Sequence, residues 1–360
     1  MIKKLIVLSC LLAALSVFFP SYGEDGNVGP SSGVEYLKIS HPTPAGPVEV
    51  HALRVDLSHP GTRIRPALAR GRIGSVERTS LISTRHLASG AINASFFDND
   101  GIPLGMVMID GRLLAEPILK RTVMGITGDS RILWDNPSFK AKIVLADSYE
   151  IFLDGLNRRR RSRRENIIYT KEFGGTTPVD PSVKEITVAD GSVASVRSGG
   201  GSDILQTDGG YVISIRDDGS IIDRVKPGDR ATLHLNLKEG WEGIVHAVGG
   251  GPRLVRSGQI EANYQSEGFQ ESVSQSIAPR SAMGVTSDGF MLLVVVDGRR
   301  INSPGISLAG LAELMLKLGA VDAMNLDGGG SSTLVYKGQV MNHPSDGFER
   351  PVSVAIVVID

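Results

Sequence analysis

Short runs of alternating apolar and polar residues dominate the chain, and this is the pattern of half-buried β-strands. The clearest alternation is VEVHALRVDL from Val48, and a continuous apolar run, FMLLVVV, covers residues 290–296. Helical spacing of apolar residues is confined to residues 75–90 and to SLAGLAELMLKLG at 307–319, which a serine opens and a glycine closes. Turns rich in Gly, Asp and Asn separate the other runs. The pattern predicts an α+β fold of mainly antiparallel β-sheets with a few helices.

Three stretches share one arrangement, and they begin with AINASFF, HAVGGG and AMNLDGGG. Each has an apolar strand, a loop of small residues, a second strand, a glycine turn and an arginine that opens a further strand. RTVMGITGD and RSAMGVTSD, from the first two stretches, share five of nine residues. We infer three repeated β units, with chance similarity among glycine-rich strands as the alternative. Equivalent loops would then bring Asn93, residues 249–251 and Asp327 into one neighbourhood.

The first 23 residues have the features of a secretory signal peptide. Two lysines precede an apolar run that is shorter than the ~20 residues of a spanning helix, and small residues follow at the expected cleavage site. Residues 24–47 are expected to be a flexible lead-in and residues 48–360 the folded domain. No later segment is apolar for long enough to cross a bilayer. We therefore expect a secreted or periplasmic protein with no stable membrane span after the signal is removed.

The charge balance and the cysteine content argue against two kinds of protein, a nucleic-acid-binding protein and a disulfide-stabilised one. Of the 38 basic residues, two lie in the signal peptide, so 36 remain against 39 acidic ones and the formal net charge becomes −3. This balance argues against a nucleic-acid-binding protein. Cys10 is the only cysteine, so the mature chain has no disulfide and must be stabilised by its core.

The stretch NLDGGGSSTLV places one carboxylate and several small residues between two apolar strands. Glycines allow the backbone to approach a ligand closely, and successive N–H groups can bind an anion such as phosphate. Asp327 beside them suits an acid/base, a nucleophile or a metal ligand, whereas a capped turn is the structural alternative. The candidate binding residues of this stretch are Asn325, Gly328, Gly329, Gly330, Ser331 and Ser332.

Further candidates lie at other strand ends. Asp297 follows the apolar run at 290–296, where a strand buried on both faces would place it at the sheet edge; a hairpin turn is the alternative. Arg280 opens a strand after a proline, and its planar guanidinium matches phosphate oxygens, although such arginines are often exposed edge charges. GGGPR is a second glycine loop, for which a tight bend is the alternative. Its candidate residues are Gly249, Gly250 and Gly251.

Two polar segments have weaker interpretations. NASFFDNDG, at 93–101, suits sugar stacking and hydroxyl recognition through Asn93, Phe97 and Asp98, although the aromatic rings can equally belong to the core. NRRRRSRREN, at 157–166, is typical of a solvated loop, with docking of an anionic polymer or processing left open. The seven histidines show no metal-ligand spacing, and no catalytic-triad motif occurs.

Several stretches together resemble the phosphodiester glycosidase domain family. They run in the family's order from about Val48 to Asp360 and are AVGGGPRLV, APRSAMGVT, LLVVVDGR, NLDGGGSSTLV, NHPSDGFERPVS and, before them, YTKEFGGTT. NASFF departs from the family's usual Asn-Gly-Gly, so side chains stand where the family commonly has none. The resemblance implies a single catalytic domain that removes a sugar from a sugar-1-phosphodiester by cleavage at the anomeric carbon, on envelope or extracellular glycans.

The implied chemistry assigns provisional roles. Its transition state requires stabilisation of phosphate charge and of a cationic sugar ring. The resemblance therefore implies that Arg280 and the glycine-rich backbone hold the phosphate, that Asp327 or Asp297 activates water or attacks C1, and that Asn93 orients a sugar hydroxyl. No cofactor is certain, and a divalent Ca²⁺ or Mg²⁺ ion held by the two acids is left open.

Two other functions stay open alongside this one. The first is a non-catalytic glycan-binding or envelope-assembly protein, although such a protein has no need of several ionisable groups. The second is a metal-dependent phosphodiesterase that cleaves P–O, against which the lack of clustered His and Asp ligands in the sequence argues. In each case the expected partner is a carbohydrate phosphodiester and not a nucleic acid.

Overall fold

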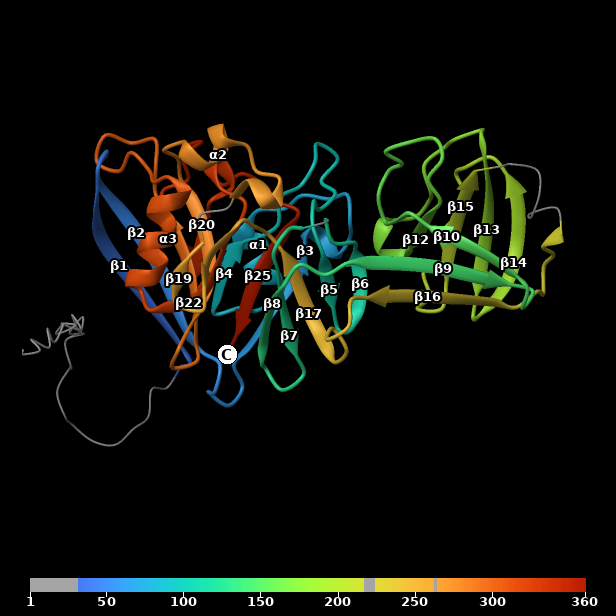
Figure 1. Ribbon diagram of the computed structural model, residues 1–360, viewed down its shortest axis with the longest axis horizontal. Coiled ribbons are helices and arrows are strands. Elements are labelled where there is room, and N and C mark those ends of the chain that lie inside the picture. The colour runs from blue at the N-terminus through green and yellow to red at the C-terminus, as the bar shows by residue number, and fades with distance from the viewer. Residues whose placement is uncertain (1–31, 119, 217–223, 262–263) are drawn as a thin grey trace, which may run out of the picture. The chain divides into compact units, whose positions relative to one another are not determined.

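The computed structural model of the protein describes residues 32–118, 120–216, 224–261 and 264–360 (Figure 1). The expected signal peptide and the first part of the expected lead-in lie outside the described residues. Residues 32–360 belong to one folded unit. Its described part contains five sheets, in which all pairs but one are antiparallel, and three short α-helices. The predicted class is thus confirmed in part, because the fold is mainly β. The helices are α1 (Thr79–Arg85), α2 (Glu271–Gln275) and α3 (Leu308–Lys317).

Three of the sheets contain the strands of the predicted repeats. The seven-stranded sheet has the order β1 (Val34–Thr43), β2 (Gly46–Asp56), β21 (Phe290–Val296), β20 (Arg280–Thr286), β22 (Ala320–Asn325), β18 (Arg253–Arg256) and β19 (Gln259–Ile260). A five-stranded sheet has the order β24 (Gln339–Val340), β23 (Leu334–Tyr336), β4 (Gly90–Asn93), β25 (Val354–Ile359) and β3 (Arg63–Leu68). A second five-stranded sheet has the order β6 (Arg112–Ala115), β5 (Val107–Ile109), β17 (Ile244–Gly249), β7 (Val123–Thr127) and β8 (Ile132–Asp135).

The three repeated units are present, and they interlock in a cycle. Each unit consists of a first strand, a small hairpin and a last strand, and the hairpins β5–β6, β18–β19 and β23–β24 all turn at a glycine with positive φ: Gly111, Gly258 and Gly338. The first strand of one unit pairs between the hairpin and the last strand of another. Thus β17 lies between β5 and β7, β22 between β18 and β20, and β4 between β23 and β25.

An inserted segment between β8 and β17 forms the other two sheets. They have the orders β10 (Tyr149–Leu153), β9 (Phe139–Leu145), β16 (Ala231–Leu237), and β11 (Gly155–Leu156), β12 (Ile167–Thr170), β15 (Tyr211–Arg216), β13 (Val183–Ala189), β14 (Ser192–Ser198). The two sheets share one hydrophobic core, in which Ile143 packs with Ile186 and Ile213, and they lie together at the right of Figure 1.

The arginine run lies in this inserted segment and only part of it is solvated. Arg158 is buried and forms ion pairs with Glu116 and Glu165. Arg160 donates from Nη2 to the carbonyl oxygen of Ser214 at 2.7 Å. Two of the six arginines therefore form structural contacts, within the insert and from it to Glu116, which the solvated-loop interpretation missed.

The predicted helix at residues 307–319 is present as α3, whereas the predicted flexible lead-in is partly a strand. Ser307 caps α3 by accepting from the N–H of Gly310 at 3.1 Å, and the apolar face of α3 is buried, as predicted. The expected flexible lead-in at 24–47 is wrong from residue 34 onward, because β1 occupies it and pairs with β2 from Val34↔Val55 to Thr43↔Gly46. The ladder of backbone hydrogen bonds to a buried strand orders this segment.

Candidate active site

The glycine loop, defined here as residues 326–333, connects β22 to β23 and is fixed by backbone hydrogen bonds on two sides. The N–H of Asp327 donates to the carbonyl oxygen of Ala94 at 2.9 Å, and the N–H of Gly329 donates to that of Pro279 at 2.8 Å. The loop therefore lies between the end of β4 and the start of β20. This position confirms that loops of different repeat units meet at one end of their strands.

The loop after β17 also belongs to this neighbourhood, as the repeat predicted. Ser95 Oγ donates to the carbonyl oxygen of Gly249 at 2.9 Å, and the N–H of Gly251 donates to that of Asn325 at 2.8 Å. Asn325 in turn donates from Nδ2 to the carbonyl oxygen of Gly251 at 2.9 Å. Asn325 thus connects two loops within the protein and is buried.

Gly249, Gly250 and Gly251 do not form an anion-binding loop, which corrects the sequence interpretation. Their N–H groups donate to carbonyl oxygens of the protein itself, those of Met106, Thr122 and Asn325. A Cβ at Gly250 would lie 2.7 Å from the Asn325 carbonyl oxygen. The glycines are required here because two backbone segments approach closely.

Two arginines that the sequence interpretation missed lie against the glycine loop. A Cβ built at Gly329 would lie 3.3 Å from Arg299 Nη2, and one built at Gly330 would collide with Arg350 Nη2 and with Asp346 Oδ2. Arg350 donates from Nε to Asp346 Oδ2 at 2.9 Å, and both arginine side chains are about half exposed. They offer accessible guanidinium groups at the loop, of the kind that bind phosphate oxygens.

Asp327 has the electrostatics of a group that exchanges protons. Burial of the carboxyl group raises the pKa of Asp327 to about 6, although the hydroxyl of Ser331, the N–H of Gly328 and the Arg350 guanidinium favour the charged form. The residue as a whole keeps some solvent exposure. A carboxyl group with a pKa near neutrality can donate and accept protons at working pH.

The backbone amides of the glycine loop contribute less to an anion site than the sequence suggested. Among residues 328–332, three amides donate to backbone carbonyl oxygens: Gly329 to that of Pro279, Ser331 to that of Gly328, and Ser332 to that of Gly329. Positive charge at the loop therefore comes from the two arginines. Both serines are buried, and it is the hydroxyl of Ser331 that hydrogen-bonds to the Asp327 carboxyl group.

Asn93 is fully buried and contacts the glycine loop instead of an open site. Its Nδ2 donates to the carbonyl oxygen of Asp327 at 2.5 Å, while its Oδ1 accepts from Ser281 Oγ at 2.8 Å and from the N–H of Thr333 at 3.1 Å. The bonds to Asp327 and Thr333 fix both ends of the loop, and the bond from Ser281 holds the Asn93 side chain in place. This geometry does not support the expected contact between Asn93 and a sugar hydroxyl. Asn93 instead positions Asp327 through the bond to its carbonyl oxygen.

Arg280 lies beside the loop along its backbone, but its guanidinium points elsewhere. Nη2 donates to the carbonyl oxygens of Val273 and Ser276 at 2.8 and 2.7 Å, and Nε donates to that of Ile306 at 3.2 Å. Burial lowers the pKa of Arg280 to about 10. The arginine thus supports the segment that contains α2, and its guanidinium is not directed at the glycine loop.

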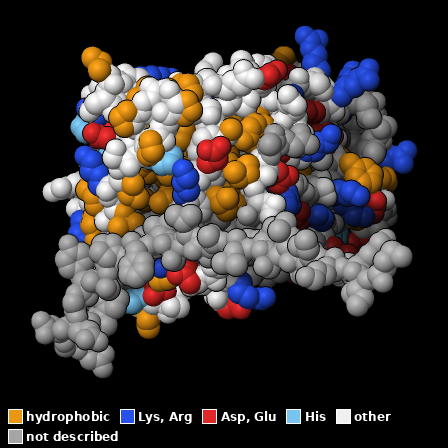
Figure 2. Space-filling model, turned by 60° about the vertical axis from the view of Figure 1, so that its left-hand side comes forward, with side chains coloured by type: hydrophobic (Ala, Val, Ile, Leu, Met, Phe, Trp, Pro, Cys, Tyr) orange, Lys and Arg blue, Asp and Glu red, His pale blue; other side chains and the backbone are white. Residues whose placement is uncertain are grey.

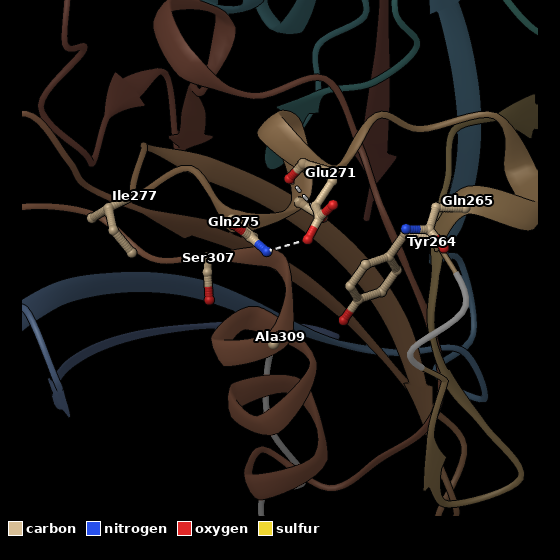
Figure 3. A pocket seen from close by; sticks show the side chains of 8 residues that line it. Tyr264, Gln265, Glu271, Gln275, Ile277, Ser307 and Ala309 are labelled. Carbon is tan, nitrogen blue, oxygen red and sulfur yellow. Dashed lines mark hydrogen bonds between the residues drawn. The ribbon is translucent and has the colours of Figure 1, made fainter.

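A cavity of about 440 Å³ lies over this supported segment (Figure 3). The figure shows the ring of Tyr264 facing Glu271, which accepts from Gln275 Nε2 at 2.6 Å, with Ser307 at the start of α3 on the other side. The cavity is lined by Tyr264, Gln265, Glu271, Ser274, Gln275, Ile277, Ser307 and Ala309. Its polar lining suits hydroxyl groups of a ligand, although none of the predicted site residues lines it.

Phe97 packs against a hydrophobic core and Asp98 caps a turn. Phe97 is partly buried against a core that includes Val335 and Val352. Asp98 Oδ1 accepts from the N–H groups of Asp100 and Ile102 at 3.0 and 2.9 Å, as an acid that caps a turn does. Neither side chain has an observed contact with the glycine loop among the described residues, so direct substrate contact remains a prediction for both.

Asp297, at the end of β21, is the centre of a second group of ionisable side chains. Its Oδ2 lies 3.1 Å from His343 Nδ1, 3.7 Å from His51 Nε2 and 3.3 Å from Arg300 Nη1. With Glu49 these residues form the carboxylate–histidine cluster (Glu49, His51, Asp297 and His343), whose ligand-type atoms all lie within 4.8 Å of one another. Burial alone would raise the pKa of Asp297, but the His51 ring and the His343 N–H hold it below its usual range.

This cluster is the main feature that the sequence did not reveal. His51 lies on β2 and His343 follows β24, so no local spacing connects them. They meet because β2 pairs with β21 and the segment after β24 passes over the end of β21, where the N–H of His343 donates to Asp297 Oδ1 at 3.0 Å. Two histidines and two carboxylates of this kind can hold a divalent metal ion.

The surface around these groups is mixed in character. Figure 2 shows hydrophobic side chains interspersed with charged ones of both signs on the face drawn. Exposed hydrophobic residues near the helices include Val273, Ile277 and Leu316. No helix among the described residues is long and apolar enough to span a membrane.

Comparison with known proteins decides the family. The model of the phosphodiester glycosidase family matches residues 174–359, which is just over half of the chain. The chain belongs to this family. The match to the phosphodiester glycosidase family includes the glycine loop and both exposed arginines, Arg299 and Arg350. It also includes Asp297 and His343 of the carboxylate–histidine cluster. Asn93 and His51 precede the matched region.

Individual relatives are similar over shorter stretches. The chain is 45% identical over 74 residues to an SPbeta prophage-derived uncharacterized protein, YomE, of Bacillus subtilis (21% of this chain, 12% of that one). It is 38% identical over 112 residues to the N-acetylglucosamine-1-phosphodiester alpha-N-acetylglucosaminidase of Bos taurus (29% and 21%). The matched part is thus about a fifth or less of either relative. A crystal structure of a hypothetical protein from Synechocystis aligns with a TM-score of 0.81 at 25% identity, covering 91% of this chain and 62% of that one.

Proposed function

We propose that this protein hydrolyses a sugar-1-phosphodiester at the anomeric carbon, on envelope or extracellular glycans outside the cytoplasm. The observation that carries the proposal is the position of Asp327, a carboxyl group with a raised pKa, on a glycine loop that lies against two half-exposed arginines. Membership of the phosphodiester glycosidase family supports it. The name of the bovine relative makes N-acetylglucosamine the first sugar to test.

The roles follow from the surroundings of each group. Arg299 and Arg350 bind the phosphate and stabilise the charge that develops on it as the C1–O bond breaks. Because a phosphate ester leaves readily, little protonation of the leaving group is needed. Asp327 is then the carboxylate that activates water or attacks C1, and it is favoured over Asp297, whose two oxygens are both occupied by protein donors.

A panel of sugar-1-phosphodiesters with product identification tests the proposal. We expect Asp327→Asn to lower turnover by about 10²–10⁴-fold, the range typical of a lost acid/base group. Asp110→Asn is the matched control, because Asp110 is an exposed turn residue with φ 51° that asparagine also adopts. Turnover by Asp327→Asn at the wild-type rate would exclude Asp327 as the catalytic carboxylate.

The carboxylate–histidine cluster favours a second candidate, a metal-dependent phosphodiesterase that cleaves P–O. Hydrolysis in ¹⁸O-labelled water separates the two, since C–O cleavage places the label on the sugar and P–O cleavage places it on the phosphate. Absence of any product across the panel would favour the non-catalytic glycan-binding alternative.

A further inference from the structure

The carboxylate–histidine cluster is built from three separate parts of the chain. Glu49 and His51 are two residues apart on β2, so their side chains emerge on the same face of the strand. Asp297 lies opposite Glu49, to whose carbonyl oxygen its N–H donates at 2.9 Å. His343 comes from the segment after β24 and lies 3.8 Å from Glu49 Oε2. The cluster is therefore a consequence of tertiary pairing and has four convergent ligand atoms.

Two buried atoms of the cluster lack the partners that burial normally requires. His51 is only 1% exposed, yet its Nε2 has no hydrogen-bond partner among the described residues and faces Asp297 Oδ2 at 3.7 Å. Glu49 Oε2 is also buried without a hydrogen bond, although Lys38 Nζ lies at 3.4 Å. Unpaired buried polar atoms are costly and rare. A common partner placed between them would satisfy both.

The other nitrogen of the His51 ring is already engaged. Nδ1 lies 2.8 Å from the hydroxyl oxygen of Tyr36, on the neighbouring strand β1. If Nδ1–H donates to Tyr36, the lone pair of Nε2 points into the cluster. Metal-binding histidines are oriented in this way, with the free ring nitrogen donating to a nearby oxygen.

We propose that Glu49, His51, Asp297 and His343 bind one divalent transition-metal ion of the Zn²⁺ type. Zinc bonds of about 2.0–2.1 Å in a tetrahedron separate neighbouring ligand atoms by about 3.3 Å. Asp297 Oδ2 lies 3.1 and 3.7 Å from the nitrogens of His343 and His51, and Glu49 Oε2 lies 3.8 Å from that of His343; all ligand atoms lie within 4.8 Å of one another. Side-chain rotations that shorten the longer separations would close the site around one ion.

The ligand set selects the kind of ion. Ca²⁺ takes six to eight oxygen ligands and Mg²⁺ prefers an octahedron of oxygens, whereas this cluster offers two imidazole nitrogens and two carboxylates. Two positive side chains, Lys38 and Arg300, lie at its rim and are partly exposed. The competing arrangement has protonated histidines paired with the acids, but it leaves His51 Nε2 beyond hydrogen-bond distance of Asp297.

The bound ion would have a positioning role for the candidate active site. His343 begins the segment that continues to Asp346 and Arg350, which lie against Gly330. A metal bond to His343 fixes that segment to the end of β21. The metal site is independent of the proposed hydrolysis, because metal binding is measured without substrate.

Titration of the tag-free protein with ZnCl₂ after dialysis against EDTA tests the site. Isothermal titration calorimetry should show one Zn²⁺ per chain, with much weaker binding of CaCl₂ and MgCl₂. His343→Ala should weaken Zn²⁺ binding by at least about tenfold, while His234→Ala, which removes an exposed histidine of β16 outside the cluster, should not change it. The side chain of His343 is 54% exposed, so its loss should leave the fold intact.

Co²⁺ substitution gives a spectroscopic readout in the wild-type protein, and a further variant tests the orientation of His51. Wild-type protein with one Co²⁺ should show the intense visible absorption of a tetrahedral site, and Tyr36→Phe should weaken metal binding by about tenfold because it removes the partner of His51 Nδ1. Absence of stoichiometric Zn²⁺ binding by the wild type, equal affinity in His343→Ala, or an octahedral Co²⁺ spectrum would overturn the proposal.

Discussion

Asp297 and Asp327 look alike in the sequence, because each follows a buried strand and each precedes a glycine, yet the fold gives them opposite surroundings. Asp297 is 1% exposed and its carboxylate accepts from the His343 N–H, with the His343 ring and Arg300 also in contact. Asp327 has a serine hydroxyl and one loop N–H as hydrogen-bond donors to its carboxyl group, and Arg350 adds a weaker electrostatic contribution. The pKa is consequently below its usual range for Asp297 and about 6 for Asp327.

The difference shows that burial alone does not decide what a carboxylate does. Desolvation is the largest influence on the pKa of both acids and acts in the same direction. The number of donors that surround the charge decides the outcome. Asp297 has enough donors to remain a permanent anion that binds cations, whereas Asp327 has few and can exchange a proton near neutral pH.

Removal of each carboxylate should therefore affect different properties, and the largest effect on stability is expected for Asp297. Asp297→Ala leaves the His343 N–H, the histidine rings and Arg300 without their common acceptor. We expect the free energy of unfolding to fall by about 3–5 kcal/mol, the range for loss of one partner from a buried ionic group. Urea denaturation in the presence of EDTA measures this without a contribution from bound metal.

Asp288→Ala is the control for this measurement. Asp288 also follows a strand of the same sheet and has an arginine partner, Arg54 at 3.0 Å, but its side chain is 59% exposed. An exposed pair of this kind contributes about 0–1 kcal/mol. If the two variants lose equal stability, the claim that Asp297 is a buried electrostatic centre is wrong.

Asp327 should show the reverse behaviour, with a smaller effect that depends on pH. Its pKa rises from 3.8 in the unfolded chain to about 6 in the fold, so the folded state binds the extra proton and stability falls as pH rises between these values. A difference of about two units corresponds to roughly 2–3 kcal/mol. Asp327→Asn removes that cost and should stabilise the protein at pH 7.5.

The pH profile of the difference is the decisive measurement. The difference in unfolding temperature between wild type and Asp327→Asn should be largest above pH 6, smaller at pH 5 and small below pH 4. Below pH 4 the wild-type carboxyl group is also neutral. Asp110→Asn is the control for the same chemical change at an exposed position. A constant difference across this range would show that the pKa of Asp327 is not raised.

The sequence predicted the parts of this picture that depend on local pattern. The three repeat units, the α3 helix with its Ser307 cap, and the approach of the loops at Asn93, residues 249–251 and Asp327 follow from strand periodicity and repeated glycine turns. Such features are encoded by neighbouring residues, so one sequence is enough to find them.

Long-range pairing accounts for the rest. Arg280 was assigned to the phosphate because it opens a strand, but carbonyl oxygens of the α2 segment surround its guanidinium. The histidine cluster was missed because His51 and His343 meet only through tertiary pairing. The sequence did contain a signal for the two exposed arginines. Arg299 lies in DGRR and Arg350 in SDGFER, and both motifs belong to stretches that carry the family resemblance.

The smallest expected effect concerns the exposed side chains that lie against the glycine loop beside Asp327, in contrast to the buried ones around Asp297. A Cβ at Gly330 would collide with the ends of the Arg350 and Asp346 side chains, which are flexible and can move aside. Gly330→Ala should therefore displace Arg350 from the loop while changing the free energy of unfolding little.

If Arg350 binds the phosphate, Gly330→Ala should lower kcat/KM for a sugar-1-phosphodiester by about tenfold, equivalent to about 1.4 kcal/mol of transition-state binding. Gly175→Ala is the matched control, because a Cβ at Gly175 meets no atom within 4 Å. Wild-type kinetics in Gly330→Ala would remove Arg350 from the phosphate site and leave Arg299 as the guanidinium at the loop. A loss of activity that parallels a large loss of stability would instead show that the loop, like the surroundings of Asp297, tolerates no rearrangement.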